Sequence, residues 1–180
     1  MAAPTREEAV RNLEGGHARV DLLVSGVSEE DLTRPATIGG GDWSAKDLIG
    51  HLATWEEVAL RTLREFQGGE MPWIERDEGP FSAPETGKVD AFNAQAVAEM
   101  KQRSLGEVRS EAERTHRELI DAIQAMSDEQ WTAKAFYPTS SNRRRRLATL
   151  VGSVLAAPQR PFGHAFAHVP DLEAYTSSLG

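Results

Sequence analysis

Apolar residues recur at three- and four-residue steps along most of this sequence, and that helical period limits the fold more than any other feature. A helix with an apolar stripe must bury the stripe against other elements. No segment shows the two-residue alternation of a half-buried strand, so we predict an all-α fold. The clearest stripe, between Ser44 and Gln67, holds Leu48, His51, Leu52, Trp55, Ala59, Leu63 and Phe66.

N-capping patterns set the expected helix boundaries. Thr5–Glu8 and Ser104–Glu107 are capping-box patterns, in which a hydroxyl accepts from the amide three residues later and the acid bonds back. Ser44–Asp47 is a third cap signal. We expect helices over residues 5–26, 44–67, 90–126 with a pause at 104–107, and 147–157, followed by a last helical segment over 162–169.

Linkers rich in glycine and proline separate these helices. Residues 68–88 form the longest one, and long loops inside compact domains are often functional lids. Pro158 and Pro161 are expected to break the chain before the last segment. Pro170 is expected to bend the chain after that segment.

A short pattern recurs after the first and third expected helices. Val27–Leu32 and Met126–Trp131 each hold a serine followed by acidic residues. Each precedes a polar linker and another helix, as expected for two helical hairpins related by a pseudo-two-fold axis. We predict a single domain over residues 1–180, folded as a four-helix bundle with long crossover loops.

The charge balance limits the partners. The sequence holds 28 acidic and 20 basic residues, with a formal net charge of −8. Such a surface repels phosphate backbones, so no direct nucleic-acid partner is expected. The absence of cysteine removes disulfides, thiolate metal sites and cysteine nucleophiles. Because Met1–Glu8 holds no signal-peptide pattern and no apolar run has membrane-spanning length, we expect a cytoplasmic protein without membrane contact.

Three of the five histidines have the pattern of metal ligands. His164 and His168 are four residues apart, which on a helix places both on one face with Cβ atoms about 5–6 Å apart. His51 lies on the apolar stripe, where its imidazole must be buried or face a cavity and needs partners for both nitrogens. Three protein ligands and an open position would form a catalytic metal site. The alternative is a set of hydrogen-bonded core histidines.

The remaining histidines and a basic run have simpler interpretations. His17 lies on the stripe of the first helix, and we interpret it as a hydrogen-bonded core residue. His116 lies among charged residues and is predicted to be exposed. Arg143–Arg146 is expected to be a solvated loop, with capture of an anion as the alternative.

The segment Trp43–Glu56 resembles the second-helix signature of the DinB superfamily, which in one branch has the pattern WSxKDxxxHLxxWE. Phe92–Gln95 and Ser104–Val108 resemble the start of the next helix in that branch and the residues after it. Gly163–His168 resembles the family's terminal His-x3-His segment. The similarity extends over most of residues 5–175.

The resemblance implies a four-helix bundle, often dimeric, that holds a divalent metal (zinc, nickel or iron) on three histidines. By motif position these are His51, His164 and His168. It implies thiol-dependent transferases or isomerases that use mycothiol or bacillithiol, and, in the most similar branch, self-resistance proteins of antibiotic producers. The latter open strained rings of DNA-alkylating products, and some lack the three histidines, so a hydrolase without a metal is equally compatible. The prolines before His164 depart from the unbroken helix of relatives.

Five further residues are site candidates with structural alternatives. Asp47 is expected to cap its helix, and its carboxylate is also placed to orient the histidine one turn later. Glu56 is a surface acid or, if it faces the pocket, a general base. Trp55 is core or a pocket wall, and Trp43 is expected to line an apolar pocket. Asn93 is a helix cap by position and a substrate-binding amide by resemblance.

We expect an enzyme that acts on a small electrophilic molecule in the bundle core, with hydrolytic detoxification or self-resistance favoured over thiol transfer. In either reaction, water or a thiol attacks a strained or activated carbon after activation by a metal or by acid–base groups of the pocket. The alternatives are a protein that sequesters a toxin without turnover and a structural dimer whose site is vestigial.

Overall fold

The computed structural model describes residues 3–39, 41–81, 87–137, 144–156 and 160–180, where helices are the regular elements apart from isolated β-bridges. The all-α fold is therefore confirmed. In chain order the elements are α1 (Arg6–Val24), α2 (Glu29–Thr33), α3 (Ala45–Gln67), η1 (Trp73–Glu75), α4 (Lys88–Lys101), α5 (Leu105–Gln124), α6 (Asp128–Trp131), α7 (Leu147–Val154) and α8 (His164–Ser177).

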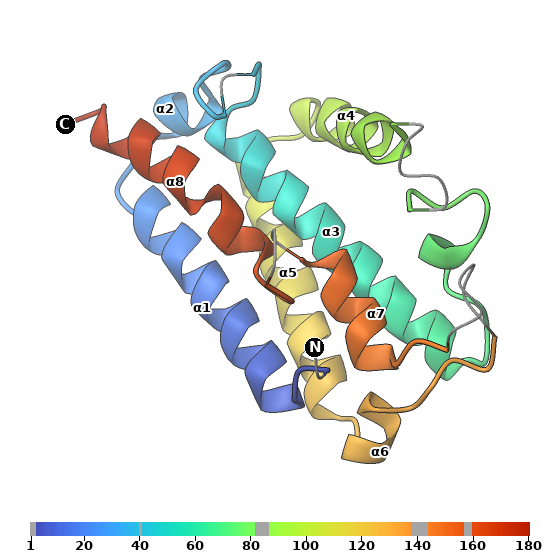
Figure 1. Cartoon of the computed structure of the whole chain (residues 1–180). Helices are drawn as coiled ribbons and strands as arrows, with labels where there is room; N and C mark the ends of the chain where they lie inside the picture. The colour runs from blue at the N-terminus through green and yellow to red at the C-terminus, as the bar shows by residue number, and fades with distance from the viewer. Residues whose placement is uncertain (1–2, 40, 82–86, 138–143, 157–159) are drawn as a thin grey trace.

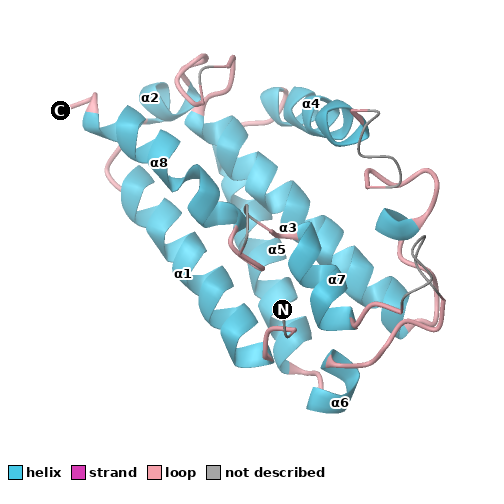
Figure 2. Cartoon of the chain, viewed as in Figure 1, coloured by secondary structure: helices cyan, strands magenta, loops and turns pink. Residues whose placement is uncertain are grey.

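The long helix α3 lies at the centre of the arrangement. It packs mainly against α5, α4 and α7, and also against α2 and α8. Figure 1 shows α1, α3 and α5 side by side, with α7 and α8 following one another as the fourth arm of the bundle. The described parts of the connections from α3 to α4 and from α6 to α7 are mostly loop, as Figure 2 shows. None of the described helices is long and apolar enough to cross a membrane.

Serine and threonine caps fix the starts of α1, α3 and α5 as predicted. The Thr5 hydroxyl accepts from the Glu8 amide at 3.1 Å, and the Glu8 carboxylate accepts from the Thr5 amide at 2.8 Å. The same reciprocal bonds join Ser104 and Glu107 at the start of α5. The two recurring serine patterns form α2 and α6, each capped by its serine. Local sequence therefore decides where these helices begin, because each cap satisfies amides that lack a partner within the helix.

The buried lysine Lys46 ties α3 to α4. Its ammonium donates to the carbonyl of Lys101, the last residue of α4, at 3.4 Å and to that of Arg103, just after the helix, at 2.8 Å. A cation at a helix C-terminus satisfies carbonyls that have no helical partner and complements the helix dipole. The predicted pause in the 90–126 helix is thus a full break, with α4 anchored on one side and α5 capped anew on the other.

The end of the chain differs from the prediction. The last segment was expected to end before Pro170, but α8 continues through that proline to Ser177. Beyond the proline, Leu172 is fully buried, and the Tyr175 hydroxyl donates to the Asp31 carbonyl at 2.6 Å. These tertiary contacts offset the backbone hydrogen bond that proline cannot make. α7 is shorter than predicted and ends at Val154; the predicted end at residue 157 and Pro158 lie outside the described residues.

Adjacent glycines on α1 predict opposite responses to one methyl group. A Cβ at Gly16 would lie 2.8 Å from the Cβ of Ala165 on α8, whereas a Cβ at Gly15 would lie 3.4 Å from the Phe166 ring. Alanine stabilises a helix interior by up to about 1 kcal/mol relative to glycine. We expect Gly15→Ala to be neutral or stabilising, and Gly16→Ala to be less stable than Gly15→Ala by at least about 1 kcal/mol, since α8 must move. Urea denaturation measures both, and equal midpoints would contradict the close packing of α1 on α8.

Candidate functional site

Three imidazoles converge where α8 begins against α3. The Nε2 atom of His164 lies 3.2 Å from that of His51 and 3.3 Å from that of His168. Ligand atoms of the three residues all lie within 4.8 Å of one another. The i,i+4 pair therefore shares one face of α8, as its spacing predicted, and meets the stripe histidine of α3.

The local fold positions the three histidine side chains. His51 lies in the second turn of α3, after its capped start, and is buried. His164 is the first residue of α8, and its amide donates to the carbonyl of Leu155 at the end of α7, at 3.0 Å. Between Leu155 and His164, Phe162 turns the chain with a left-handed φ of 56° and packs its buried ring near Trp131. The histidine pair therefore lies on one helix, α8, although Pro161 is close before it.

All three histidines are neutral at pH 7. Burial lowers the pKa of His51 to about 3, and the adjacent His164 and His168 add to the effect. Burial, with a contribution from His168, lowers the pKa of His164 to about 4. Burial also lowers the pKa of His168, although Asp171 opposes the shift. A neutral imidazole has one ring nitrogen with a free lone pair, so the cluster is rich in nitrogen ligands.

These three residues fit a divalent metal. Two ligands at about 2.0–2.1 Å from a tetrahedral ion are about 3.3 Å apart, and the two Nε2 separations are 3.2 and 3.3 Å. Among the described residues, the buried Nδ1 atoms of His51 and His164 have no hydrogen-bond partner. In the tautomer with the proton on Nδ1, the Nε2 lone pair is free to bind an ion.

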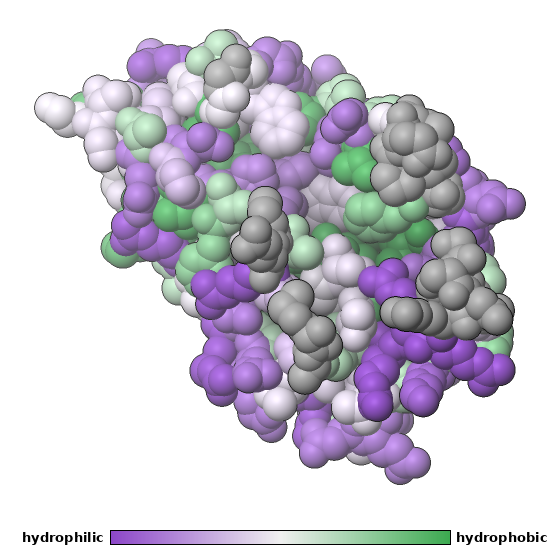
Figure 3. Space-filling model, viewed as in Figure 1, coloured by the Kyte–Doolittle hydropathy of each residue, from purple (hydrophilic) through white to green (hydrophobic). Residues whose placement is uncertain are grey.

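Aromatic side chains border the histidines on the α4 side of α3. The Trp43 ring lies 4.9 Å from the His51 ring, and the Trp55 ring lies 6.3 Å from the His164 ring. The Trp55 indole donates to Asn93 Oδ1 at 2.9 Å. All three predicted substrate-binding residues therefore lie together beside the cluster. Figure 3 shows apolar side chains reaching the surface between α8 and α4, with hydrophilic side chains around the margin.

The structure differs from the sequence-based predictions for Asn93 and Asp47. Asn93 was expected to cap a helix start, but α4 begins at Lys88 and Asn93 lies inside it, bonded to an indole. Asp47 caps α3: its Oδ2 accepts from the Ser44 amide at 2.9 Å. Its Oδ1 is buried without a partner, and no hydrogen bond to His51 is present. The predicted orienting role of Asp47 therefore lacks a direct contact in this structure.

Glu56 and His116 form a pair that the sequence interpretation missed. His116 was predicted to be exposed, yet its Nδ1 lies 3.0 and 3.1 Å from the Glu56 carboxylate oxygens and its side chain is 11% exposed. Its ring stacks on His17 with centroids 4.0 Å apart, and His17 Nε2 in turn lies 3.3 Å from Asp21. The missed signal is spacing, because position 116 lies four after Ala112 on the buried stripe of α5.

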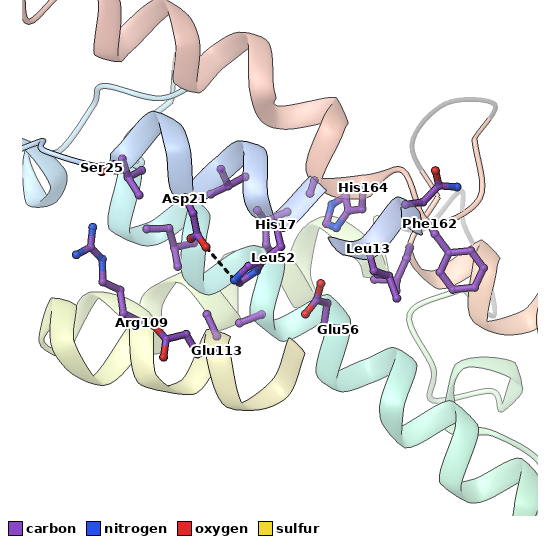
Figure 4. A pocket seen from close by; sticks show the side chains of 18 of the residues that line it. Leu13, His17, Asp21, Ser25, Leu52, Glu56, Arg109, Glu113, Phe162 and His164 are labelled. Carbon is purple, nitrogen blue, oxygen red and sulfur yellow. Dashed lines mark ion pairs between the residues drawn. The ribbon is translucent and has the colours of Figure 1, made fainter. Parts of the chain in front are cut away.

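A cavity of about 370 Å³ lies among α1, α3, α5 and α8. Figure 4 shows Glu56, His17 and Asp21 around it, with His164 at one side. It lies on the flank of α3 opposite to α4, since its lining comes from α1, α5 and α8. Glu56, predicted to be a surface acid or a base, therefore faces a cavity that also reaches one of the three converging histidines.

Two arginines of the basic run Arg143–Arg146 bond to neighbouring parts of the fold. Arg145 bonds to Glu75 at 2.7 Å and to the Ser153 hydroxyl at 2.7 Å, and Arg146 donates to the Thr132 carbonyl. The expectation of a solvated loop is therefore wrong for Arg145, which is half-buried. Arg143 lies outside the described residues.

Comparison with protein-family models shows the family to which the chain belongs. The DinB superfamily model matches residues 12–156. The chain belongs to the DinB superfamily. None of the curated proteins matches it. An uncharacterised protein from Escherichia coli UTI89 has a similar solved structure, with 12% identity, a TM-score of 0.72, and 97% of this chain and 94% of that one covered.

Two further solved structures resemble this DinB-superfamily chain. One is the mycothiol-dependent maleylpyruvate isomerase, with 16% identity and a TM-score of 0.65, covering 96% of this chain and 63% of that one. The other is the colibactin self-resistance protein ClbS in complex with a double-stranded DNA, with 13% identity and a TM-score of 0.64, covering 99% and 95%. At these identities the likeness establishes the fold.

The His17 environment predicts two opposite pKa changes. Burial lowers the pKa of His17, charge on His116 lowers it further, and Asp21 raises it. We expect Asp21→Asn to lower the pKa of His17, because the imidazolium loses an anionic partner, and His116→Gln to raise it, because a competing cation is removed. NMR titration of the ring signals measures both, with the distant Glu7→Gln as control. Shifts in the same direction would contradict the stacked arrangement.

Proposed function

We propose that this DinB-superfamily protein is an enzyme that acts on a small electrophilic molecule at His51, His164 and His168, with hydrolytic ring opening favoured over thiol transfer. The observation that supports it is the convergence of three neutral imidazoles beside a wall of aromatic side chains. The Nδ1 atoms of His51 and His164, which have no hydrogen-bond partner among the described residues, are costly to maintain in a core that apolar residues could fill. A reaction centre accounts for their presence better than packing does.

A divalent metal bound by the three histidines would lower the pKa of a water or thiol and supply a nucleophile at neutral pH. The surrounding residues would then hold the substrate. Trp43 and Trp55 offer flat apolar faces for its body, and the Asn93 amide, fixed by the Trp55 indole, offers a hydrogen bond to a polar group. Asp47 holds the start of α3, and so the position of His51, through its cap.

Glu56 remains the candidate acid–base residue. Its carboxylate is held by His116 and faces the cavity that also reaches His164. A molecule that spans the cavity would meet both residues. A carboxylate oriented by an imidazole can accept a proton from a reacting group within hydrogen-bond distance.

The structural neighbours favour two versions of this chemistry. One neighbour is a mycothiol-dependent isomerase, and the other is a self-resistance protein. They support, respectively, thiol transfer and removal of a toxic metabolite as the reaction of this chain. The second neighbour was solved with DNA, whereas the net charge of −8 favours a small molecule as the direct partner here.

Metal content tests the reaction centre. Protein purified without a histidine tag and supplied with zinc, nickel or iron should hold close to one metal per chain, measured by elemental analysis. His51→Ala should lose most of it, since two remaining ligands bind weakly. The matched control His17→Gln, which removes a histidine outside the cluster, should keep it. Equal metal content in the two variants would overturn the assignment.

Turnover tests the chemistry. Styrene oxide, a strained-ring electrophile, is incubated with the protein, with and without a low-molecular-weight thiol, and the products are identified by mass spectrometry. We expect a diol without thiol, formed at least about tenfold more slowly by His51→Ala. A thioether formed only with thiol would assign the transferase instead. Stoichiometric loss of the free electrophile without a product would assign sequestration and contradict an enzyme.

A further inference from the structure

The cavity among α1, α3, α5 and α8 is lined by charged side chains in addition to His164. Glu56 lies at depth, with its side chain 13% exposed, while Asp21 is 64% exposed toward the solvent. Glu113 and Arg109, one turn apart on α5, also line it. Neither side chain has an ion-pair or hydrogen-bond partner among the described residues. The lining therefore holds three carboxylates against one guanidinium.

His17 does not offset the negative charge of the lining, whereas His116, behind the wall, is bonded to the Glu56 carboxylate. His17 lines the wall and is stacked on His116, with an angle of 11° between the rings. Burial and the charge of His116 lower the pKa of His17, so its ring is neutral at pH 7. The carboxylate of Glu56 accepts from one nitrogen of His116, and a carboxylate has about four acceptor positions. An acceptor-rich, half-buried anion is therefore available to a ligand.

The rest of the wall is apolar. Leu13, Ala112 and Phe162 are buried, and Leu52 is half-buried beside Glu56. A volume of about 370 Å³ is within the range of about 300–1,000 Å³ of small-molecule sites, which are mostly apolar with a few placed polar groups. The best-matched ligand has an apolar body and a hydrogen-bond donor with positive charge.

We propose that this cavity binds a small apolar molecule that carries a protonated amine, with Glu56 as the anchor of the ammonium group. The amine donates to the free acceptor positions of the Glu56 carboxylate, which His116 fixes in place. The apolar body packs against Leu52, Leu13 and Phe162. Asp21 and Glu113 at the solvent side attract the cation toward the cavity. The site stands on the cavity and its charges alone, and it needs neither the metal nor the reaction proposed above.

Three probes that share a phenylethyl body and differ in charge test the proposal on metal-free protein: phenethylamine, 2-phenylethanol and 3-phenylpropionate. Titration calorimetry gives each affinity, and the ring signals of His17 report binding beside that residue by NMR. We expect phenethylamine to bind at least about tenfold more tightly than the alcohol, and the carboxylate to bind most weakly. Equal binding of the three probes, or no binding of the amine, would overturn the proposal.

Matched variants locate the anchor. Glu56→Gln keeps an acceptor for His116 but removes the charge, and it should weaken phenethylamine binding about tenfold. Glu57→Gln, on the exposed side of the same helix turn, should leave binding unchanged. Ala112→Leu fills the cavity and should abolish binding of every probe. If Glu56→Gln and Glu57→Gln bind the amine equally, Glu56 is not the anchor. If Ala112→Leu still binds it, the cavity is not the site.

Discussion

The burial of α3 on several sides is the constraint on which the rest of the structure depends. A polar side chain on such a helix must find a partner or pay the cost of desolvation, and α3 carries several of them. Lys46 donates to the carbonyls of Lys101 and Arg103 at the end of α4, Thr62 bonds to a carbonyl of its own helix, and Glu56 accepts from His116. Among the described residues, two buried polar atoms of α3 lack a hydrogen-bond partner, namely Asp47 Oδ1 and His51 Nδ1. Both residues lie in the first two turns of α3, and His51 belongs to the candidate reaction centre.

The converging histidines depend on how α8 begins. Its first residue is itself one of the three, and the amide of His164 is bonded to the end of α7. The end of α7 and the start of α8 are therefore one unit that sets the position of His164 against α3. The contact of α1 with α8 at Gly16 supports this unit from the other side. The position of the His164 imidazole thus rests on backbone contacts of α7, α8 and α1, which packed interiors transmit.

Sequence alone predicted the features that local chemistry decides. The serine and threonine caps, the stripe of α3 and the i,i+4 spacing of His164 and His168 are local, and the structure shows them as predicted. Tertiary contacts decided the rest. α8 passes through Pro170 because buried residues beyond it pack well, and His116 is buried because a facing helix supplies a carboxylate. Neither contact is visible in the neighbours of those residues along the chain, although the stripe of α5 includes position 116.

The two flanks of α3 carry different sets of polar and aromatic side chains. On one flank Trp43 and Trp55 border the converging imidazoles, and on the other an acid-rich cavity surrounds Glu56. His164 belongs to both, since its ring borders Trp55 and lines the cavity. Charge on a cavity ligand and charge at the imidazoles would therefore interact across one ring in a medium of low dielectric constant. A cation held at Glu56 would disfavour further positive charge at His164, so, if both proposed sites bind their ligands, cation occupancy of one flank and metal affinity of the other would be linked reciprocally.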